Sequence, residues 1–222
     1  MTNLAVFDLD NTLINTDSDH AWPQYLIKKG LVDAEETERQ NEKFYRDYQA
    51  GCLDIDAFLK FHLAPLARFS REELDGMHRE FTAEFIAPHI SDMARMLVEG
   101  HRAAGDELLV ISSTNEFIIT PICQIFGIDN VIGTQLETDA DGNYTGNYTG
   151  IPSLKEGKIT RLHQWLAARG KDLGDYGKVY FYSDSKNDLP LLRAVDEPVA
   201  VNPDAELLRE ALEKGWPVLN FK

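Results

Sequence analysis

The stretch Leu-Ala-Val-Phe-Asp-Leu-Asp-Asn-Thr-Leu-Ile at residues 4–14 decides how this chain is expected to fold. Its first four residues are apolar and include types that favour a buried strand. Asp8, Asp10 and Thr12 follow at every second position. Because side chains alternate between the two faces of a strand, these three are expected to point the same way as the strand frays into a loop. Two neighbouring carboxylates repel each other, so the pattern predicts a bound cation or a shared proton between them.

From about residue 91 onward, apolar strand patterns alternate with helical patterns. Strands are expected at 107–112, 131–132, 179–182 and 198–201, and helices at 91–104, 115–126, 156–169, 187–194 and 204–214. Strand–helix alternation predicts an α/β fold, a doubly wound and mostly parallel sheet with helices on both faces. Functional sites in such sheets lie at the carboxyl ends of the strands.

The segment between the first strand and residue 91 has only helical patterns. Asp33 with Glu36, and Ser70 with Glu73, have the spacing of helix capping boxes, and Gly51 is expected to end a helix. Pro23 fits the first turn of another helix. We therefore predict a Rossmann-like core, residues 1–16 and 89–222, interrupted by a helical domain, residues 17–88.

Residues 139–150, Asp-Ala-Asp-Gly-Asn-Tyr-Thr-Gly-Asn-Tyr-Thr-Gly, predict a β-hairpin. The Asp141-Gly142 pair is a strong signal for its turn. Two interpretations remain open at this point. The hairpin is either an exposed structural element or a flap that edges the active site.

Composition limits the classes of partner. The chain has 222 residues and a formal net charge of −15, from 37 acidic against 22 basic residues, with no basic cluster. This argues against a nucleic-acid partner. No segment is apolar enough for a membrane span or a secretory signal, and Cys52 and Cys123 form no CxxC motif. We therefore expect a cytoplasmic protein in a reducing compartment, without a membrane partner. No pattern in the sequence fixes the oligomeric state.

Polar residues recur at the expected ends of strands and starts of helices. They are Ser112 and Ser113 after one strand, Lys158 near the start of a helix, and the run Ser183-Asp184-Ser185-Lys186-Asn187-Asp188 after another strand. With Asp8 and Asp10 they supply carboxylates for a hard cation, hydroxyl groups, and a lysine for an anion. A carboxylate that attacks a phosphate monoester needs such cations to offset the repulsion between anions. The set therefore indicates phosphoryl transfer.

The same residues carry a family resemblance. Asp8-Leu-Asp-Asn-Thr12 resembles the DxDxT signature of the haloacid dehalogenase superfamily. Ser112, Lys158 and the 183–188 run match its second, third and fourth motifs in order. The helical insertion is similar to the C1-type cap of that superfamily. Over its whole length the chain resembles subfamily IB, the phosphoserine phosphatase-like members.

The resemblance implies a role for each matched residue. Asp8 would be the nucleophile and a ligand of Mg²⁺, and Asp10 would be the acid and base, with its backbone carbonyl also on the metal. Asp184 would be the third metal ligand. Ser112, Ser113, Lys158 and Asn187 would hold the phosphoryl oxygens, and Asp188 would support the metal waters or Lys158. The implied cofactor is therefore Mg²⁺.

Substrate choice is expected to depend on the segment just after the nucleophile loop. Phosphoserine phosphatases carry a glutamate nine residues after the nucleophile, where this chain has the shorter Asp17. Asp17, Asp19 and Trp22 are candidate substrate contacts, although the same residues could simply open a helix. Their negative charge favours a substrate with an amine or imidazole cation. Histidinol phosphate and phosphoserine are the candidates.

The predicted function is therefore a Mg²⁺-dependent phosphatase that hydrolyses a small phosphorylated metabolite through an aspartyl-phosphate intermediate. A phosphotransferase or mutase would share every motif and differ only in the acceptor. A phospho-acceptor regulatory protein also uses acids and a lysine around Mg²⁺, but Asp10 would hasten loss of its phosphoryl group. A dehalogenase attacks carbon and needs neither Asp10 nor a metal.

Overall fold

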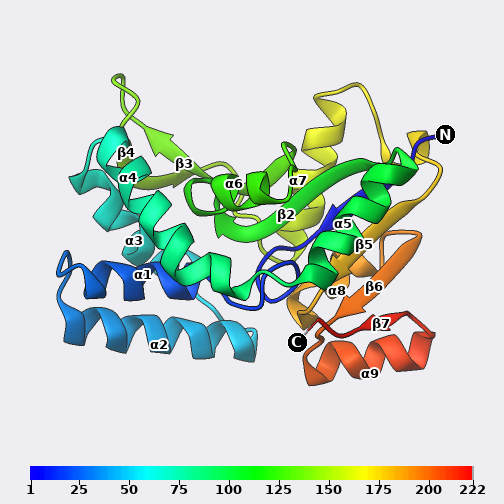
Figure 1. Ribbon diagram of the computed structural model, residues 1–222, viewed down its shortest axis with the longest axis horizontal. Coiled ribbons are helices and arrows are strands. Elements are labelled where there is room, and N and C mark those ends of the chain that lie inside the picture. Colours follow the sequence, from blue (N-terminus) through cyan, green and yellow to red (C-terminus); the bar gives the residue numbers. More distant parts are fainter. Residues whose placement is uncertain (222) are drawn as a thin grey trace.

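The computed structural model describes residues 1–221, in which one seven-stranded sheet has the order β4-β3-β2-β1-β5-β6-β7 (Figure 1). The strands are β1 (Leu4–Phe7), β2 (Glu107–Asn115), β3 (Val131–Thr138), β4 (Tyr144–Thr149), β5 (Val179–Ser183), β6 (Glu197–Val201) and β7 (Val218–Leu219). Neighbouring strands are parallel except for the antiparallel pair of β3 and β4. The predicted α/β fold is confirmed.

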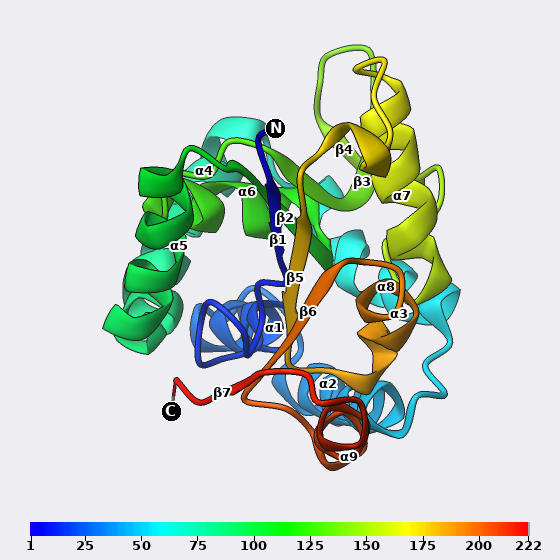
Figure 2. The same cartoon turned by 90° about the vertical axis from the view of Figure 1, so that its right-hand side faces the viewer.

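Helices cover both faces of this sheet (Figure 2). One face carries α5 (Asp92–Ala104) and α6 (Glu116–Ile125), and the other carries α7 (Glu156–Ala167), α8 (Leu189–Leu192) and α9 (Ala205–Lys214). The alternation of β1 explains both layers, because Ala5 and Phe7 pack into one apolar cluster while Leu4 and Val6 pack into the other. None of the helices within residues 1–221 has the length and apolar character needed to cross a membrane.

The sheet differs from the sequence prediction at the ends of two strands and at one edge strand. β2 continues to Asn115 and β3 to Thr138, well past the predicted ends. Both extensions are rich in polar residues, and the β2–β3 register shifts between Ile111 and Asn115, so apolar patterning gave no sign of them. β7 was not predicted, since it is two residues long and follows a proline.

The segment after β1 is helical, as predicted. It contains α1 (Ser18–Lys28), α2 (Ala34–Ala50), α3 (Ile55–Leu63), η1 (Ala64–Arg68), α4 (Arg71–Phe81), η2 (Thr82–Ile86) and η3 (Ala87–His89). The expected caps form: Asp33 accepts from the Glu36 N–H, both bonds of the Ser70–Glu73 box are present, and Gly51 has a left-handed φ of 75°. The first helix starts earlier than predicted, because Asp17 caps it and Pro23 therefore lies inside it.

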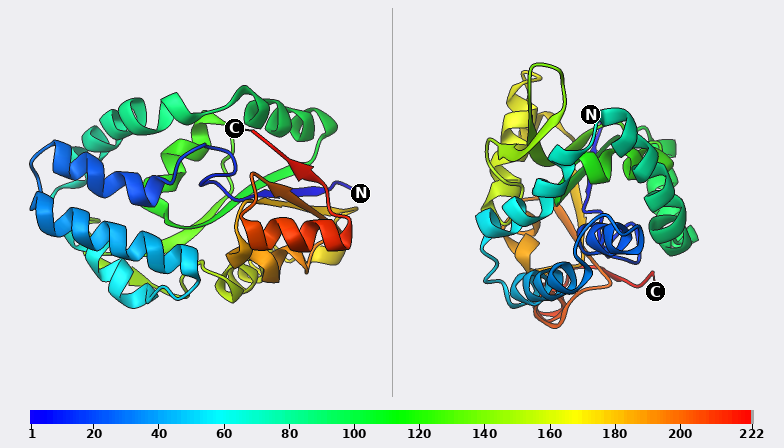
Figure 3. Two further views of the ribbon diagram at one scale, coloured as in Figure 1. Left: turned by 90° about the horizontal axis from the view of Figure 1, so that it is seen from below. Right: turned by 90° about the vertical axis from the view of Figure 1, so that its left-hand side faces the viewer.

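We call residues 17–88 the helical insertion. Its helices extend beyond the carboxyl ends of the sheet strands (Figure 3). The chain enters and leaves this segment side by side: the Asn15 N–H donates to the His89 carbonyl at 2.8 Å, and Ile14 forms a β-bridge with Ile90. The division of the chain into two domains at these residues stays a prediction.

The predicted hairpin forms from β3 and β4, and it packs against the helical insertion (Figure 1). The Tyr148 hydroxyl donates to Asp56 Oδ1 at 2.5 Å, and the Arg71 guanidinium lies 4.0 Å from the centre of the Tyr144 ring. No described residue of 139–150 lines the pocket beside Asp8. The hairpin therefore supports the insertion from outside.

The entry into α7 is tightly constrained. Lys155 has a left-handed φ of 53°, which is costly for a residue with a Cβ. Two residues later, a Cβ on Gly157 would lie 2.1 Å from the Pro152 carbonyl oxygen. Glycine is therefore required at 157 for α7 to begin where it does.

Gly157→Ala is expected to lower the free energy of unfolding by about 1–3 kcal/mol, because the added methyl group forces the backbone apart. The urea midpoint of unfolding measures the effect. Gly100→Ala in α5 is the matched control, since a Cβ there meets nothing within 4 Å. That control should be neutral or stabilising by up to about 1 kcal/mol. Equal midpoints for the two variants would contradict the constraint.

Candidate active site

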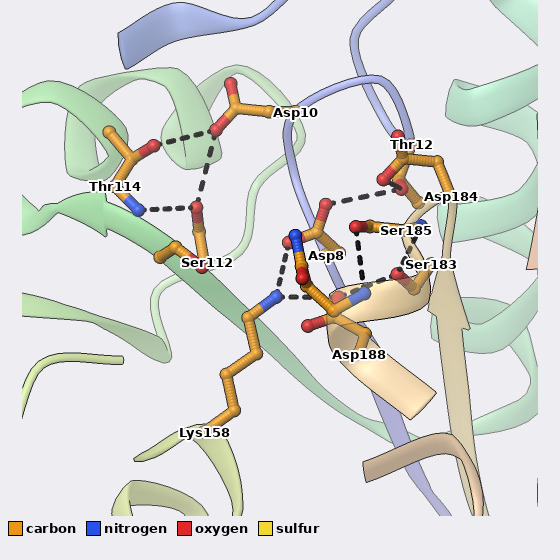
Figure 4. Close-up of polar contacts among 12 residues, drawn as sticks. Asp8, Asp10, Thr12, Ser112, Thr114, Lys158, Ser183, Asp184, Ser185 and Asp188 are labelled. Atoms are coloured by element: carbon orange, nitrogen blue, oxygen red, sulfur yellow. Dashed lines mark hydrogen bonds and ion pairs between the residues drawn. The ribbon is translucent and has the colours of Figure 1, made fainter. Parts of the chain in front are cut away.

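The carboxyl ends of three adjacent strands bring the predicted polar residues together (Figure 4). Phe7 of β1 pairs with Val110 of β2 on one side and with Tyr182 of β5 on the other. Asp8 directly follows β1 and Asp184 directly follows β5. Because β1 is the central strand from which the sheet grows in both directions, this edge is where parallel sheets form their binding crevices.

Lys158 is the buried cation of the site. Its Nζ donates to Asp8 Oδ1 and to Asp188 Oδ2, each at 2.7 Å, and the residue is 1% exposed. The Ser183 hydroxyl also donates to Asp188 Oδ2 at 2.7 Å. Burial of the ammonium opposes its charge, but Asp188 and Asp8 outweigh burial and hold the pKa of Lys158 above its usual range. This arrangement fixes a positive charge directly beside Asp8.

A second group of oxygen atoms lies on the other side of Asp8. The Thr12 hydroxyl is 3.3 Å from Asp8 Oδ2 and 3.5 Å from Asp184 Oδ1, so the two carboxylates face a common space. Asp8, Asp184 and Asp188 together carry three negative charges against one ammonium. A divalent cation would therefore neutralise the cluster.

The available donors fit Mg²⁺, which needs only a few protein ligands, better than they fit a metal ion that is coordinated by protein side chains alone. Within residues 1–221, no group of three or more His, Cys, Asp or Glu side chains converges as a metal site. Asp8 and Asp184 offer two carboxylates, and the Asp10 carbonyl is a possible backbone ligand. Mg²⁺ commonly takes one or two carboxylates and completes its shell with waters and phosphate oxygens. The oxygen-only set at this position meets that requirement.

Without a bound cation, burial and mutual repulsion raise the pKa values of the carboxylates in this cluster. Burial, with repulsion from Asp188 and Asp10 and partial relief from Lys158, raises the pKa of Asp8 to about 7. Burial and the charge of Asp8 also raise the pKa of Asp184 well above its usual range. A bound divalent cation would favour the ionised forms and lower both pKa values.

Asp10 has surroundings quite different from those of Asp8. Its carboxylate accepts the Thr114 hydroxyl at 2.9 Å and the Ser112 hydroxyl at 3.4 Å (Figure 4). It also accepts the Ser18 N–H at 2.7 Å. Burial, and next the charge of Asp17, raises the pKa of Asp10 to about 6. A carboxyl group with a pKa near 6 can exchange a proton close to neutral pH.

A pocket opens from these carboxylates toward the helical insertion. Its lining residues are Asp8, Asp10, Asp17, Asp19, His20, Asn41, Phe44, Tyr45, Tyr48, Leu53, Ile55, Phe58, Ser112, Ser113, Thr114 and Leu154. Four of them are aromatic and four are aspartates, and no lysine or arginine lines it within the described chain. The wall beyond Asp8 and Asp10 is therefore apolar and aromatic, with negative charge as its only fixed charge.

One of the predicted site residues lies elsewhere. Trp22 does not line the pocket: it is 2% exposed and packs against Tyr25, Phe81 and Phe117. This corrects its assignment as a substrate contact. The Asn187 amide donates to the Tyr48 carbonyl of the insertion at 3.2 Å, and its predicted role at the phosphate stays a prediction. Ser113, Asp17 and Asp19 do line the pocket.

Sequence reasoning missed the residues that join the insertion to the core. The Lys155 ammonium donates to the Gly51 carbonyl at 2.7 Å. Lys155 lies three residues before Lys158 in the sequence. Together with the Asn187–Tyr48 bond, it holds the carboxyl end of α2 against the site. The signal in the sequence was weak, because a lysine three residues before another lysine is ordinary on a protein surface.

Comparison with known proteins agrees with this geometry. Residues 5–193 match the model of the haloacid dehalogenase-like hydrolases. A histidinol-phosphatase of Neisseria meningitidis serogroup C (strain 8013) is 81% identical over 222 residues, which is the full length of both chains.

Solved structures give the same fold. A protein of unknown function from Bordetella pertussis Tohama I superposes with a TM-score of 0.94 at 42% identity, over all of both chains. A phosphoserine phosphatase carrying a phospho-aspartyl intermediate analogue has a TM-score of 0.68 at 18% identity, over 100% of this chain and 94% of that one. The second likeness bears on the fold alone.

The fold and its strand-end carboxylates are those of a phosphoryl-transfer hydrolase. The chain belongs to the haloacid dehalogenase-like hydrolase family, and the prediction of a phosphoric monoester hydrolase is confirmed. The resemblance seen in the four sequence motifs is thereby confirmed as well.

Asp10→Asn is expected to stabilise the metal-free protein at alkaline pH. The pKa of Asp10 is about 6 in the folded chain, against 3.8 for an ordinary aspartate, so the folded state binds an extra proton between these pH values. Stability of the native protein therefore falls as the pH rises from about 4 to 6, and the full penalty is present above 6. Removing the charge should add about 3 kcal/mol to the free energy of unfolding at pH 8.

Urea unfolding in EDTA at pH 8 and pH 4 measures this difference. The gain from Asp10→Asn should disappear at pH 4, where the native carboxyl group is protonated. Asp75→Asn, an exposed acid of α4, is the control and should change little at either pH. A variant that is less stable than the native protein at pH 8 would refute this account of the Asp10 environment.

Proposed function

We propose that this protein is a Mg²⁺-dependent phosphatase of a small cationic phosphomonoester, L-histidinol phosphate, and acts through an aspartyl-phosphate intermediate. The observation that carries the substrate is the charge of the pocket. Asp17 and Asp19 lie beyond the catalytic carboxylates, and no lysine or arginine among the described residues lines the same space. Such a pocket favours a substrate whose organic part is positively charged.

The same charge distribution separates the two candidate substrates. Phosphoserine carries a carboxylate next to its amine, and that carboxylate would meet two aspartates and no balancing cation. Histidinol phosphate has an amine and an imidazole but no carboxylate. The aromatic residues Phe44, Tyr45 and Phe58 also offer flat surfaces for a ring. The 81% identical relative named as a histidinol-phosphatase supports the same choice.

The first chemical step transfers the phosphoryl group to Asp8. A carboxylate oxygen of Asp8 attacks phosphorus, and the bond between phosphorus and the alcohol oxygen breaks. Asp10 gives its proton to the departing alkoxide, for which its raised pKa is suited. Lys158, held 2.7 Å from Asp8, balances negative charge on the transferring group. Ser112 and Ser113 are placed to donate to the phosphoryl oxygens.

The second step releases phosphate. Asp10, now ionised, takes a proton from a water molecule whose oxygen attacks phosphorus, and the bond to Asp8 breaks. Because the same carboxyl group serves as acid and then as base, it must lie near both the alcohol and the water. Mg²⁺ held by Asp8, Asp184 and the Asp10 carbonyl would supply positive charge that reduces repulsion between the substrate and Asp8. Asp188 keeps Lys158 in place.

The helical insertion, in this proposal, is a cap that closes over the substrate. Lys155 and Asn187 bind the last carbonyls of α2, where the negative end of the helix dipole favours a cation. Both residues lie within three positions of a proposed catalytic residue. Closure would exclude bulk water during the first transfer, and it would leave the pocket too enclosed for a protein substrate. The two cysteines, neither of them in a disulfide, are compatible with a cytoplasmic setting.

Substrate choice is tested by comparing kcat/KM for L-histidinol phosphate, L-phosphoserine and an aryl phosphate by phosphate release. Histidinol phosphate should exceed phosphoserine by about a hundredfold or more, because placing a carboxylate beside like charges costs several kcal/mol. Phosphoserine as the better substrate would overturn the proposal. A phosphotransferase or mutase would instead pass the phosphoryl group to an acceptor alcohol, and it would release no phosphate into water when that acceptor is absent.

The chemistry is tested with Asp8→Asn and with metal removal. Asp8→Asn should lower kcat on every phosphomonoester by at least about a thousandfold, because the amide cannot attack phosphorus. EDTA should abolish activity of the native enzyme, and added Mg²⁺ should restore it. Asp33→Asn, which changes an N-cap of α2 outside the pocket, is the control. Substantial turnover by the Asp8 variant would rule out the covalent route.

A further inference from the structure

Asp19 is a buried carboxylate with no role in the chemistry described above. It lines the pocket, its side chain is 14% exposed, and it lies one residue beyond Ser18, whose N–H is bonded to Asp10. Burial, with the charges of Asp17 and Asp10, raises its pKa well above the usual range. A carboxylate placed there without a basic partner is costly, which indicates that a ligand supplies the missing cation.

His62 provides a second, independent observation. It lies on α3, is 4% exposed, and has no hydrogen-bond partner at either ring nitrogen. Its Nδ1 points to Asp19 Oδ1 at 3.7 Å, just beyond a hydrogen bond. Burial lowers the pKa of His62 to about 3, so the ring is neutral. Unpaired buried nitrogens are costly, and a native structure rarely carries such groups without a functional reason.

We propose that Asp19 accepts the imidazole N–H of the substrate and that His62 is the positioning residue that holds the Asp19 carboxylate for it. This assignment rests on the proposed function and identifies the part of the pocket that recognises the substrate ring. In the substrate complex, His62 Nδ1–H donates to one oxygen of Asp19, and the other oxygen accepts from the ligand.

The positions of the two pocket acids distinguish the amine from the ring. Asp19 Oδ1 lies 3.7 Å from His62 Nδ1, and the His62 ring packs against Phe58 of the pocket wall. Asp17 instead caps α1, at the end of the loop that leads from Asp8 and Asp10. In histidinol phosphate the amine is on the carbon next to the phosphoester carbon, and the ring is one carbon further away. Asp19, beside the aromatic wall, therefore suits the ring, and Asp17 is left for the amine.

The aromatic wall agrees with this placement. The Phe58 and His62 rings are 4.1 Å apart between centroids, and Phe44 lies edge-on to Phe58 at 5.6 Å. Phe44 and Phe58 both line the pocket. A substrate imidazole that donates to Asp19 can therefore rest against these rings, where stacking and charge act together.

The test compares L-histidinol phosphate with L-phenylalaninol phosphate, which share the phosphorylated amino alcohol and differ in the ring, imidazole in the first and phenyl in the second. Asp19→Asn should reduce the native preference for histidinol phosphate about 10- to 100-fold in kcat/KM, mainly through KM, because a hydrogen bond to a charged group is lost. Asp17→Asn should lower kcat/KM for both substrates by a similar factor. Asp75→Asn, outside this pocket, should leave the preference unchanged. If Asp19→Asn slows both substrates equally, Asp19 does not recognise the ring.

Two substitutions of His62 separate positioning from packing. His62→Phe removes both nitrogens, whereas His62→Asn keeps an N–H near the Nδ1 position. We expect the phenylalanine variant to lose most of the ring preference and the asparagine variant to recover part of it, with urea midpoints showing that both are folded. A merely structural role predicts that kcat/KM changes alike for the two substrates in both variants, and that result would remove His62 from the proposal.

A binding measurement keeps this inference distinct from the proposed function. L-histidinol and L-phenylalaninol are compared as inhibitors of aryl phosphate hydrolysis, which does not require turnover of histidinol phosphate. Stronger inhibition by histidinol that depends on Asp19 supports the ring subsite even if histidinol phosphate proves a poor substrate. Equal inhibition by the two alcohols in the native enzyme overturns the subsite while leaving phosphatase activity untouched.

Discussion

The burial of Lys158 between Asp8 and Asp188 is the constraint on which the rest of the site depends. An ammonium that is 1% exposed is stable only when charged partners surround it at hydrogen-bond distance. That requirement fixes where α7 begins, and so explains the left-handed Lys155 and the close approach of Gly157 to Pro152. It also fixes the loop after β5, since Ser183 must reach Asp188. Local backbone strain here serves a global electrostatic need.

The excess of buried negative charge lowers the stability of the folded protein, and the proposed chemistry depends on that charge. Lys158 compensates only part of the repulsion among the strand-end carboxylates, and the proposed cation would compensate more. This is the familiar conflict between stability and activity, located in a few named groups. The surrounding core, which buries β1 completely on both faces, supplies the stability that allows it.

Much of this architecture was predictable because it depends on local sequence. The β1 pattern gave the central strand and its two carboxylates, and glycine and cap residues such as Gly51 and Ser70 marked helix ends. Lys158 stands out by its place at the start of a predicted helix, and Asp184 by its place just after a predicted strand. These features depend on neighbours in the sequence, where periodicity and caps are informative.

The remaining features depend on how helices pack, which the sequence pattern does not state. α1 begins at Ser18, and its residues Ala21, Trp22 and Tyr25 therefore share one buried face. As a result, Trp22 turns inward while Asp19 faces the pocket. The sequence pattern does not locate that starting residue to within one position. A shift of one residue turns the buried face of the helix by about 100°. The meeting of His62 with Asp19, and of Lys155 with Gly51, joins segments that only the tertiary fold brings together.

The paired entry and exit of the helical insertion has an evolutionary consequence. Ile14 and Ile90 are β-bridge neighbours, so the core chain is nearly continuous across the point where the insertion departs. A segment attached through two adjacent stretches of chain can be lengthened, shortened or exchanged with little disturbance to the sheet. Asp8, Asp184 and Lys158 all belong to the sheet side of that junction. If the proposed function holds, the chemistry can be inherited unchanged while the insertion diverges to accept new metabolites.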